Sequence, residues 1–190
     1  MQFDMFRAAA APIDLLLIEH ASPGYAARTA ENARSADTTV AFAVDFTTSG
    51  ERLTKKLAGK KYVGIPFGCA VDTAAAALAQ FLATTESRSL NVAGNGICTL
   101  SKHSVTQHEA NQWILDVLRK VVAAVPLGAI RSGGQTGVDT AGLVAALCIG
   151  IPAIGLYPHG FRRRFEVEQD ILTDKLVLER DLRAQAAAIQ

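Results

Sequence analysis

Residues 127–160, LGAIRSGGQTGVDTAGLVAALCIGIPAIGLYPHG, constrain the fold of this chain most strongly. Residues 127–131 are short and apolar, as in a buried strand, and Ser132 with the two glycines after it ends that strand. A helix that is apolar on nearly every side is predicted over about 138–148, as expected where a sheet covers it. Residues 152–157 are predicted to form the next strand. Strand, turn, helix and strand in this order indicate a βαβ unit of a parallel sheet.

The start of that helix is a candidate anion site. The N–H groups near Gly134 to Val138 are expected to point out of the carboxyl edge of the sheet, where the helix dipole favours negative charge. The motif is neither a Walker A loop nor a dinucleotide-binding GxGxxG turn, so the residues indicate an anion and no more. The alternative is a tight turn without a ligand. The clustering of Gln135, Thr136 and Asp139 at the turn argues against this alternative.

Asp139 allows two interpretations. Its carboxylate either compensates the helix dipole in the first turn, or meets a ribose hydroxyl or a metal. Both stay open at the level of sequence.

The remainder of the chain repeats the alternation of strands and helices. Strands are predicted at 38–46, 61–67 and 89–93, and helices at 25–36, 51–60, 72–85 with Asp72 as N-cap, and 106–125. Residues 13–18 are a short strand or an apolar docking segment, residues 1–11 a loose arm, 97–107 a loop, and about 171–190 a C-terminal extension with a short strand and a helix. These elements predict one Rossmann-like α/β domain over residues 1–190, with a doubly wound, mainly parallel sheet of about five to seven strands and helices on both faces.

Composition excludes several classes of function. With 190 residues, 49% of them hydrophobic, the chain can bury a substantial core as one domain. A net charge of +1 gives no global basic field, which argues against a nucleic-acid partner. The three cysteines lie far apart without a CxxC pair, so we expect reduced thiols and no structural metal. No segment is long enough for a membrane span, and a cytoplasmic protein is expected; a homo-oligomer stays open.

Three turns are predicted to meet in one crevice. The turns 47–50, 94–96 and 133–137 each follow a strand, and the carboxyl ends of parallel strands lie at one edge of the sheet. Arg162, Arg163 and Arg164 follow the main motif, and one of these guanidinium groups could reach a phosphate there. The alternative for these arginines is a solvated face, because acidic residues follow closely.

SGGQTGVDTAG followed by GIPAIGLYPHG resembles the SLOG superfamily of Rossmann-like proteins, in particular the circularly permuted YpsA-type family, which is also described as molybdenum-cofactor carrier-like. The resemblance extends to ARTAENARSADTTVAF, which is similar to the family's RT…N…SD-T pattern, and to SGERLTKKLA and SLNVAG. In the carrier-like family GGQTGVD comes first and LNVAG closes the chain, whereas here the order is reversed. Ser49-Gly50-Glu51 stands where that family has Gly-Gly-Thr, and Asn95-Gly96 where it has Pro-Arg.

The resemblance implies a nucleotide or a nucleotide-derived, phosphorylated small molecule as the ligand, with a molybdenum cofactor as a further candidate. The candidate ligand-binding residues are Ser49, Gly50, Thr54, Gly94, Asn95, Gly96, Gly133, Gly134, Gln135, Thr136, Gly137, Asp139 and Arg162. A binding, sensor or carrier protein is the favoured function. A phosphoribohydrolase-like N-glycosidic hydrolase, with Glu51 or Asp139 as the candidate catalytic carboxylate, is the alternative, and a single-stranded nucleic-acid binder is the third hypothesis.

Overall fold

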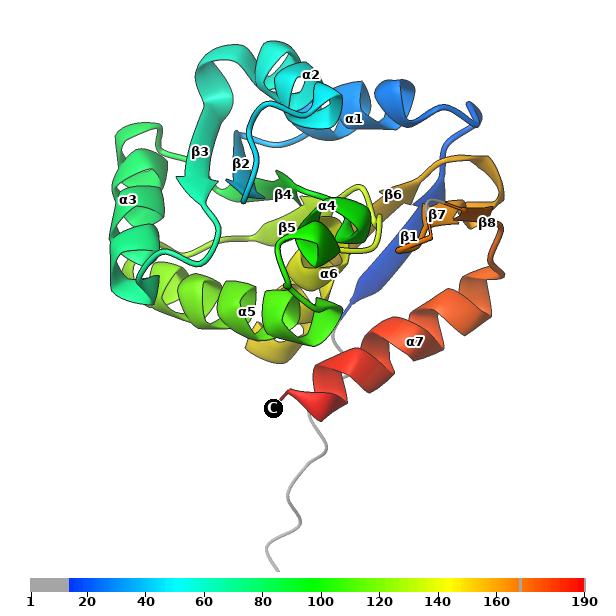
Figure 1. Ribbon diagram of the computed structural model, residues 1–190. Coiled ribbons are helices and arrows are strands. Elements are labelled where there is room, and N and C mark those ends of the chain that lie inside the picture. Colours follow the sequence, from blue (N-terminus) through cyan, green and yellow to red (C-terminus); the bar gives the residue numbers. More distant parts are fainter. Residues whose placement is uncertain (1–13, 168, 190) are drawn as a thin grey trace, which may run out of the picture.

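The computed structural model describes residues 14–167 and 169–189. At its centre is a six-stranded sheet in the order β1-β6-β5-β4-β2-β3, in which every neighbouring pair of strands is parallel (Figure 1). The strands are β1 (Leu15–Glu19), β2 (Thr38–Ala43), β3 (Tyr62–Pro66), β4 (Ser89–Gly94), β5 (Ala129–Ser132) and β6 (Ala153–Tyr157). A separate antiparallel hairpin joins β7 (Arg163–Arg164) to β8 (Asp170–Ile171).

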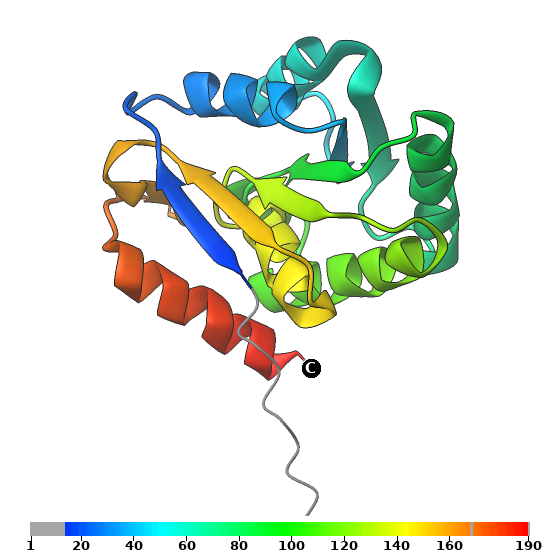
Figure 2. The same cartoon turned by 180° about the vertical axis from the view of Figure 1, so that it is seen from behind.

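Helices cover both faces of the sheet. The α-helices are α1 (Tyr25–Arg34), α2 (Ser49–Ala58), α3 (Val71–Thr84), α4 (Ile97–Lys102), α5 (Gln107–Ala124), α6 (Val138–Ile149) and α7 (Lys175–Ala188), with 3₁₀ turns η1 (Gly59–Lys61) and η2 (His159–Phe161). One face carries α1 and α2, and the other carries α3, α5, α6 and α7 (Figures 1 and 2). The predicted doubly wound, mainly parallel α/β fold is therefore confirmed.

The strand order reverses between β2 and β4. From β2 the chain moves outward to β3, and from β4 it moves in the opposite direction to β5 and β6. In open α/β sheets, ligands bind at the carboxyl ends of the strands beside such a reversal. The turns after β2, β4 and β5 lie at this edge.

The core explains why the predicted elements form. All six residues of β2 are buried, as are most residues of α6, because both are covered by other elements on more than one side. Strand β2 is accordingly β-branched and aromatic rather than alternating, and α6 lacks a polar face. At the end of α6, Gly150 adopts the left-handed conformation with φ 86°, as expected of a C-terminal glycine stop.

Four details of the sequence prediction are corrected or decided. The segment predicted as 13–18 is a strand, β1, which pairs with β6, and Ile13 lies outside the described residues, as does the arm 1–11. The predicted loop 97–107 contains α4, whose six residues are too few to show a helical periodicity. Helix α2 begins at Ser49, two residues earlier than predicted. Asp72 is not the N-cap of α3, because the helix starts one residue before it, and its carboxylate instead pairs with Lys120 at 2.9 Å.

Candidate functional site

The three glycine-containing turns lie around one cavity of about 640 Å³ at the carboxyl edge of the sheet. Its lining residues come from α1 (Tyr25, Ala26, Arg28, Thr29, Asn32), α2 (Ser49, Gly50, Glu51, Leu53, Thr54), β4 and the turn into α4 (Asn91, Ala93, Gly94, Gly96, Ile97, Cys98, Thr99), the GGQTG turn and α6 (Gly133, Gln135, Thr136, Asp139), and β7 (Arg164). Segments separated by more than 100 residues therefore meet at one site. Nine of the predicted ligand residues are among them.

The other four predicted ligand residues lie elsewhere. Gly134 has φ 68°, and a Cβ there would collide with the buried ring of Tyr157, so this glycine is required by packing rather than by a ligand. Gly137 has φ 98° and faces the backbone of the Asn95–Ile97 turn. Arg162 does not line the cavity; its guanidinium lies 3.7 Å from Asp170.

Asn95 is the fourth of these residues, and its side chain connects the end of β4 to the end of β2. Its Oδ1 accepts hydrogen bonds from the N–H groups of Val44 and Asp45 at 2.8 and 3.0 Å, and its Nδ2 donates to the carbonyl of Asp45 at 3.0 Å. With 3% of its surface exposed, Asn95 holds the end of β4 against the end of β2. Its role in the described residues is to shape the cavity.

Three N–H groups at the start of α6 have hydrogen-bond partners within the protein. The Gly137 N–H donates to Oε1 of Gln107 at 2.6 Å, and the Val138 N–H donates to the carbonyl of Asn95 at 3.1 Å. The Thr140 N–H donates to the carbonyl of Gln135 at 2.9 Å. The sequence predicts an anion on the Gly134 to Val138 backbone, and an anion that took the N–H groups of Gly137 and Val138 would have to displace these partners.

Gln135 and Thr136 hold the strand that follows β6 in place. The Gln135 side chain donates to the carbonyl of Arg162 at 3.0 Å and accepts from the N–H of Arg164 at 2.9 Å, and the Thr136 hydroxyl donates to the carbonyl of Arg164. The Sγ of Cys98 donates to the carbonyl of Phe165 at 2.8 Å. These contacts fix β7 above the GGQTG turn.

Of the three consecutive arginines, Arg164 is the one at the cavity. Arg163 is buried and pairs with Asp181 at 3.0 Å, away from the site. The Arg164 guanidinium is bound by Asp170, with Nε to Oδ1 at 2.8 Å and Nη2 to Oδ2 at 3.3 Å, and it lies 5.4 Å from the ring centre of Tyr25. Asp170 also accepts from the Tyr25 hydroxyl at 2.8 Å, and the adjacent Arg164 holds the pKa of Asp170 below its usual range.

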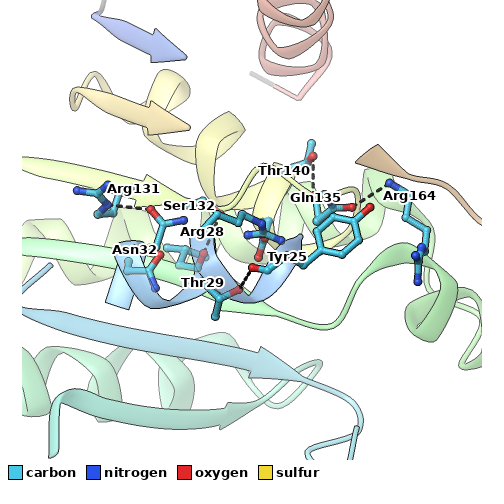
Figure 3. Close-up of polar contacts among 12 residues, drawn as sticks. Tyr25, Arg28, Thr29, Asn32, Arg131, Ser132, Gln135, Thr140 and Arg164 are labelled. Atoms are coloured by element: carbon cyan, nitrogen blue, oxygen red, sulfur yellow. Dashed lines mark hydrogen bonds and ion pairs between the residues drawn. The ribbon is translucent and has the colours of Figure 1, made fainter. Parts of the chain in front are cut away.

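Arg28 and Asp139 form a buried ion pair in the cavity wall. Nη1 of Arg28 lies 3.0 Å from Oδ2 of Asp139, and each side chain is only 9% exposed. Burial raises the pKa of Asp139, while the guanidinium acts in the opposite direction. A Cβ at Gly133 would overlap the Arg28 guanidinium, so this glycine allows the pair to form against the turn. Figure 3 shows Arg28 between Tyr25 and Asn32 of α1, with Gln135 and Arg164 nearby.

Glu51 is a buried carboxyl group without a hydrogen-bonding partner for its Oε2. It lines the cavity from the first turn of α2, where 3% of its surface is exposed. Burial raises its pKa to about 8, and the charges of Asp139 and Asp45 act in the same direction. Glu51 is therefore largely protonated at neutral pH, and it can donate a hydrogen bond as well as accept one.

Unpartnered polar atoms gather at this cavity. Among the described residues, seven buried side-chain N or O atoms have no hydrogen-bond partner, and four of them belong to residues that line it. They are Nε of Arg28, Nδ2 of Asn32, Oε2 of Glu51 and Oδ1 of Asn91. Leaving such an atom unpaired costs about 1–3 kcal/mol, so ordered water or a bound polar molecule in the cavity would stabilise these four atoms.

Sequence reasoning missed Tyr25, Arg28, Asn32 and Asn91 as site residues, and it named Arg164 only as one of three candidate arginines. A signal for three of them was present, because Arg28 and Asn32 belong to the RT…N pattern and Asn91 to SLNVAG. Tyr25 carries no comparable signal, since its contact with Asp170 depends on how the β7–β8 hairpin lies over α1.

Residues 14–167 and 169–189 contain no group of three or more His, Cys, Asp or Glu side chains arranged to hold a metal ion. They also contain no helix with both the length and the apolar character needed to cross a bilayer. The three cysteines form no disulfide bond there.

Comparison with known proteins places the chain in a family. No curated protein matches it. A family model described as the circularly permutated YpsA SLOG family matches residues 8–118 and 130–176, and these ranges include every residue that lines the cavity. The match covers most of the chain and agrees with the permuted order of its motifs. The protein therefore belongs to the circularly permutated YpsA SLOG family.

Proposed function

We propose that this protein binds a phosphorylated, nucleotide-type small molecule in the cavity between α1, α2 and the GGQTG turn. The observation that supports this most strongly is the set of four unpartnered polar atoms on Arg28, Asn32, Glu51 and Asn91. Donors and acceptors are both present, and a sugar or a base offers both in return. The cavity, at about 640 Å³, has the usual volume of a small-molecule site.

The charges suggest how such a ligand would be oriented. Arg28 is paired with Asp139, and Glu51 is largely neutral at pH 7, so the buried wall offers little net positive charge. We infer that the neutral sugar or base meets this wall. The phosphate then lies toward Arg164, whose side chain is 47% exposed. An exposed ion pair contributes little free energy, so Arg164 can release Asp170 and bind the phosphate instead.

A second candidate function, N-glycosidic hydrolysis, is supported by Glu51. A carboxyl group with a raised pKa near neutrality, unpartnered and in a cavity, is suited to general acid or base catalysis. Asp139 is a weaker candidate for this role, because its carboxylate is already bound to Arg28.

One pair of measurements tests both functions. Mass spectrometry of small molecules released from the denatured protein should identify a nucleotide-type compound, and calorimetric titration should give tighter binding of a nucleoside 5′-monophosphate than of the nucleoside or of phosphate alone. A released pterin would indicate the molybdenum cofactor instead. Free base and ribose 5-phosphate after incubation would identify a hydrolase, and absence of binding by every nucleotide tested would contradict the proposal.

A further inference from the structure

Exposed apolar side chains gather at the β1 end of the sheet. Of the nine large hydrophobic residues that are exposed in the described part of the chain, seven lie on β1, on the β7–β8 hairpin with its link to α7, and on the first turn of α7. They are Leu16, Ile18, Val167, Ile171, Leu172, Leu176 and Val177. Figures 1 and 2 show these elements side by side at one end of the molecule, away from α2 and α3. Leu16 and Ile18 point to the sheet face opposite the buried Leu17, whereas Leu176 and Val177 lie on α7, so a partner that extends this edge of the sheet can cover apolar side chains on both faces.

Strand β1 also offers a backbone edge. It is the last strand of the sheet and pairs only with β6 within the described residues. The carbonyl of Asp14 accepts from Ala153 and the N–H of His20 donates to Tyr157, so the even-numbered residues of β1 face β6. The odd-numbered residues, 15, 17 and 19, therefore direct their N–H and C=O groups outward. Such an edge can pair with a further strand.

We propose that a second copy of this chain occupies this edge, with the two β1 strands antiparallel about a two-fold axis at Leu17. This register pairs the outward backbone groups of residue 17 with those of Leu17 of the partner subunit, which is the hydrogen-bonded type of pair. It also sets Leu16 opposite Ile18 of the partner subunit. The strand is thus complementary to itself in the apolar side chains that it exposes. An isologous interface needs this property, whereas an unrelated strand does not.

The neighbouring elements enlarge the contact. The same axis sets the α7 helices of both copies antiparallel on one face of the joined sheet, which would bury Leu176 and Val177, now 74% and 45% exposed. Five-residue strands alone would bury too little surface for a stable dimer, which needs roughly 1,000 Å² or more in total. The inference does not rest on the proposed ligand, because α7 and β1 contribute no residue to the cavity lining.

Sedimentation velocity tests the association. The parent protein should sediment as a dimer at micromolar concentration, and Leu16→Lys/Ile18→Lys as a monomer with an unchanged circular dichroism spectrum, because both side chains are exposed before association. Leu57→Lys is the matched control, since Leu57 is 37% exposed on α2, and it should remain dimeric. A monomeric parent, or a double variant that stays dimeric, would overturn the proposal and assign the surface to another occupant.

Disulfide trapping tests the register. Leu16→Cys and Ile18→Cys, mixed as two single variants, should give a covalent heterodimer under mild oxidation, because a non-hydrogen-bonded antiparallel pair has its Cα atoms about 4.5 Å apart. Neither variant alone should cross-link appreciably, since Leu16 and its own copy would be diagonal neighbours roughly 7–8 Å apart. The parent protein reports any background from Cys69, Cys98 and Cys148. Equal cross-linking of Leu16→Cys alone, or none in the mixture, would show that this register is wrong.

Discussion

At the scale of single residues, Glu51 combines a raised pKa with a buried carboxyl oxygen that has no hydrogen-bond partner. Its native pKa of about 8 exceeds its ordinary value of 4.5, so between these pH values the native state binds more protons than the unfolded state. The free energy of unfolding should then fall as the pH rises through this window, by at most about 1.4 kcal/mol per pH unit. Above pH 8 Glu51 is ionised in both states, and the loss of unfolding free energy caused by its ionisation is complete.

Replacing Glu51 by glutamine removes this titration while keeping the size of the side chain. We expect Glu51→Gln to melt at a higher temperature than the parent above pH 8, and at nearly the same temperature below pH 4.5, where the parent carboxyl is neutral. Melting temperatures of both proteins across this range give the comparison. Parallel curves would mean that Glu51 is ionised at its ordinary pKa in the native state.

Gly134 is a residue at which the structure changes the prediction. The sequence analysis names Gly134 as a candidate ligand-binding residue, whereas in the structure its φ of 68° and the ring of Tyr157 leave no room for a Cβ. Gly134→Ala should lower the free energy of unfolding by several kcal/mol, since backbone strain adds to overpacking.

Gly150→Ala is the control for Gly134. Gly150 also has a positive φ, 86°, but a Cβ there would meet no atom within 4 Å, so its cost should be about 1 kcal/mol. Urea denaturation of both variants measures the difference. Equal losses would show that the Tyr157 contact is not what excludes a side chain at Gly134.

At the scale of elements, β7 is expected to present Arg164 to the ligand. Arg164→Ala should weaken binding of a nucleoside 5′-monophosphate about tenfold and leave nucleoside binding unchanged, because a charge-assisted hydrogen bond to phosphate is worth about 1.5–3 kcal/mol. In the parent protein, Asp170 binds the guanidinium that would bind the phosphate. Asp170→Asn weakens this ion pair and should therefore not reduce the affinity for the monophosphate. Calorimetric titration measures both; a loss of nucleoside affinity in Arg164→Ala as large as that for the monophosphate would exclude a phosphate contact.

Element prediction from the sequence succeeded where local pattern and burial agree. Helix α5 shows a helical period of apolar residues, α6 and β2 are recognised by their continuous apolar runs, and the Thr106–Glu109 capping box fixes the start of α5. The six-residue helix α4 and the two-residue strands β7 and β8 are too short for any period to show.

The amides of α6 illustrate a second limit of sequence prediction. A free helix N-terminus is a sound expectation from a strand–turn–helix pattern, yet here Gln107, 30 residues away, takes the N–H of Gly137. Only the packing of α5 against α6 brings this amide side chain to the turn. Local sequence does not contain that information.

At the scale of the whole molecule, topology explains how much of the site was predictable. Carboxyl ends of parallel strands share one edge, so three turns could be expected in one crevice before any side chain was placed. The wall contributed by α1 could not be derived in this way. Arg28 and Asp139 are 111 residues apart, and their pairing depends on α1 crossing the sheet from β1 to β2.

The central claim is that this cavity receives the ligand, and Gly50 allows a direct measurement. Gly50 lines the cavity on α2, and a Cβ there would meet no atom within 4 Å. Alanine and leucine have similar helix propensities, so Gly50→Ala and Gly50→Leu differ mainly in the volume that they place at the cavity.

Calorimetric titration of both variants with the nucleoside 5′-monophosphate that binds the parent most tightly provides the test. Both variants should be as stable as the parent to within about 1 kcal/mol. Gly50→Ala should bind nearly as the parent does, whereas Gly50→Leu should lose at least about tenfold in affinity, which corresponds to about 1.4 kcal/mol. Parental affinity in a folded Gly50→Leu protein would contradict the account, because the ligand would then bind outside this cavity.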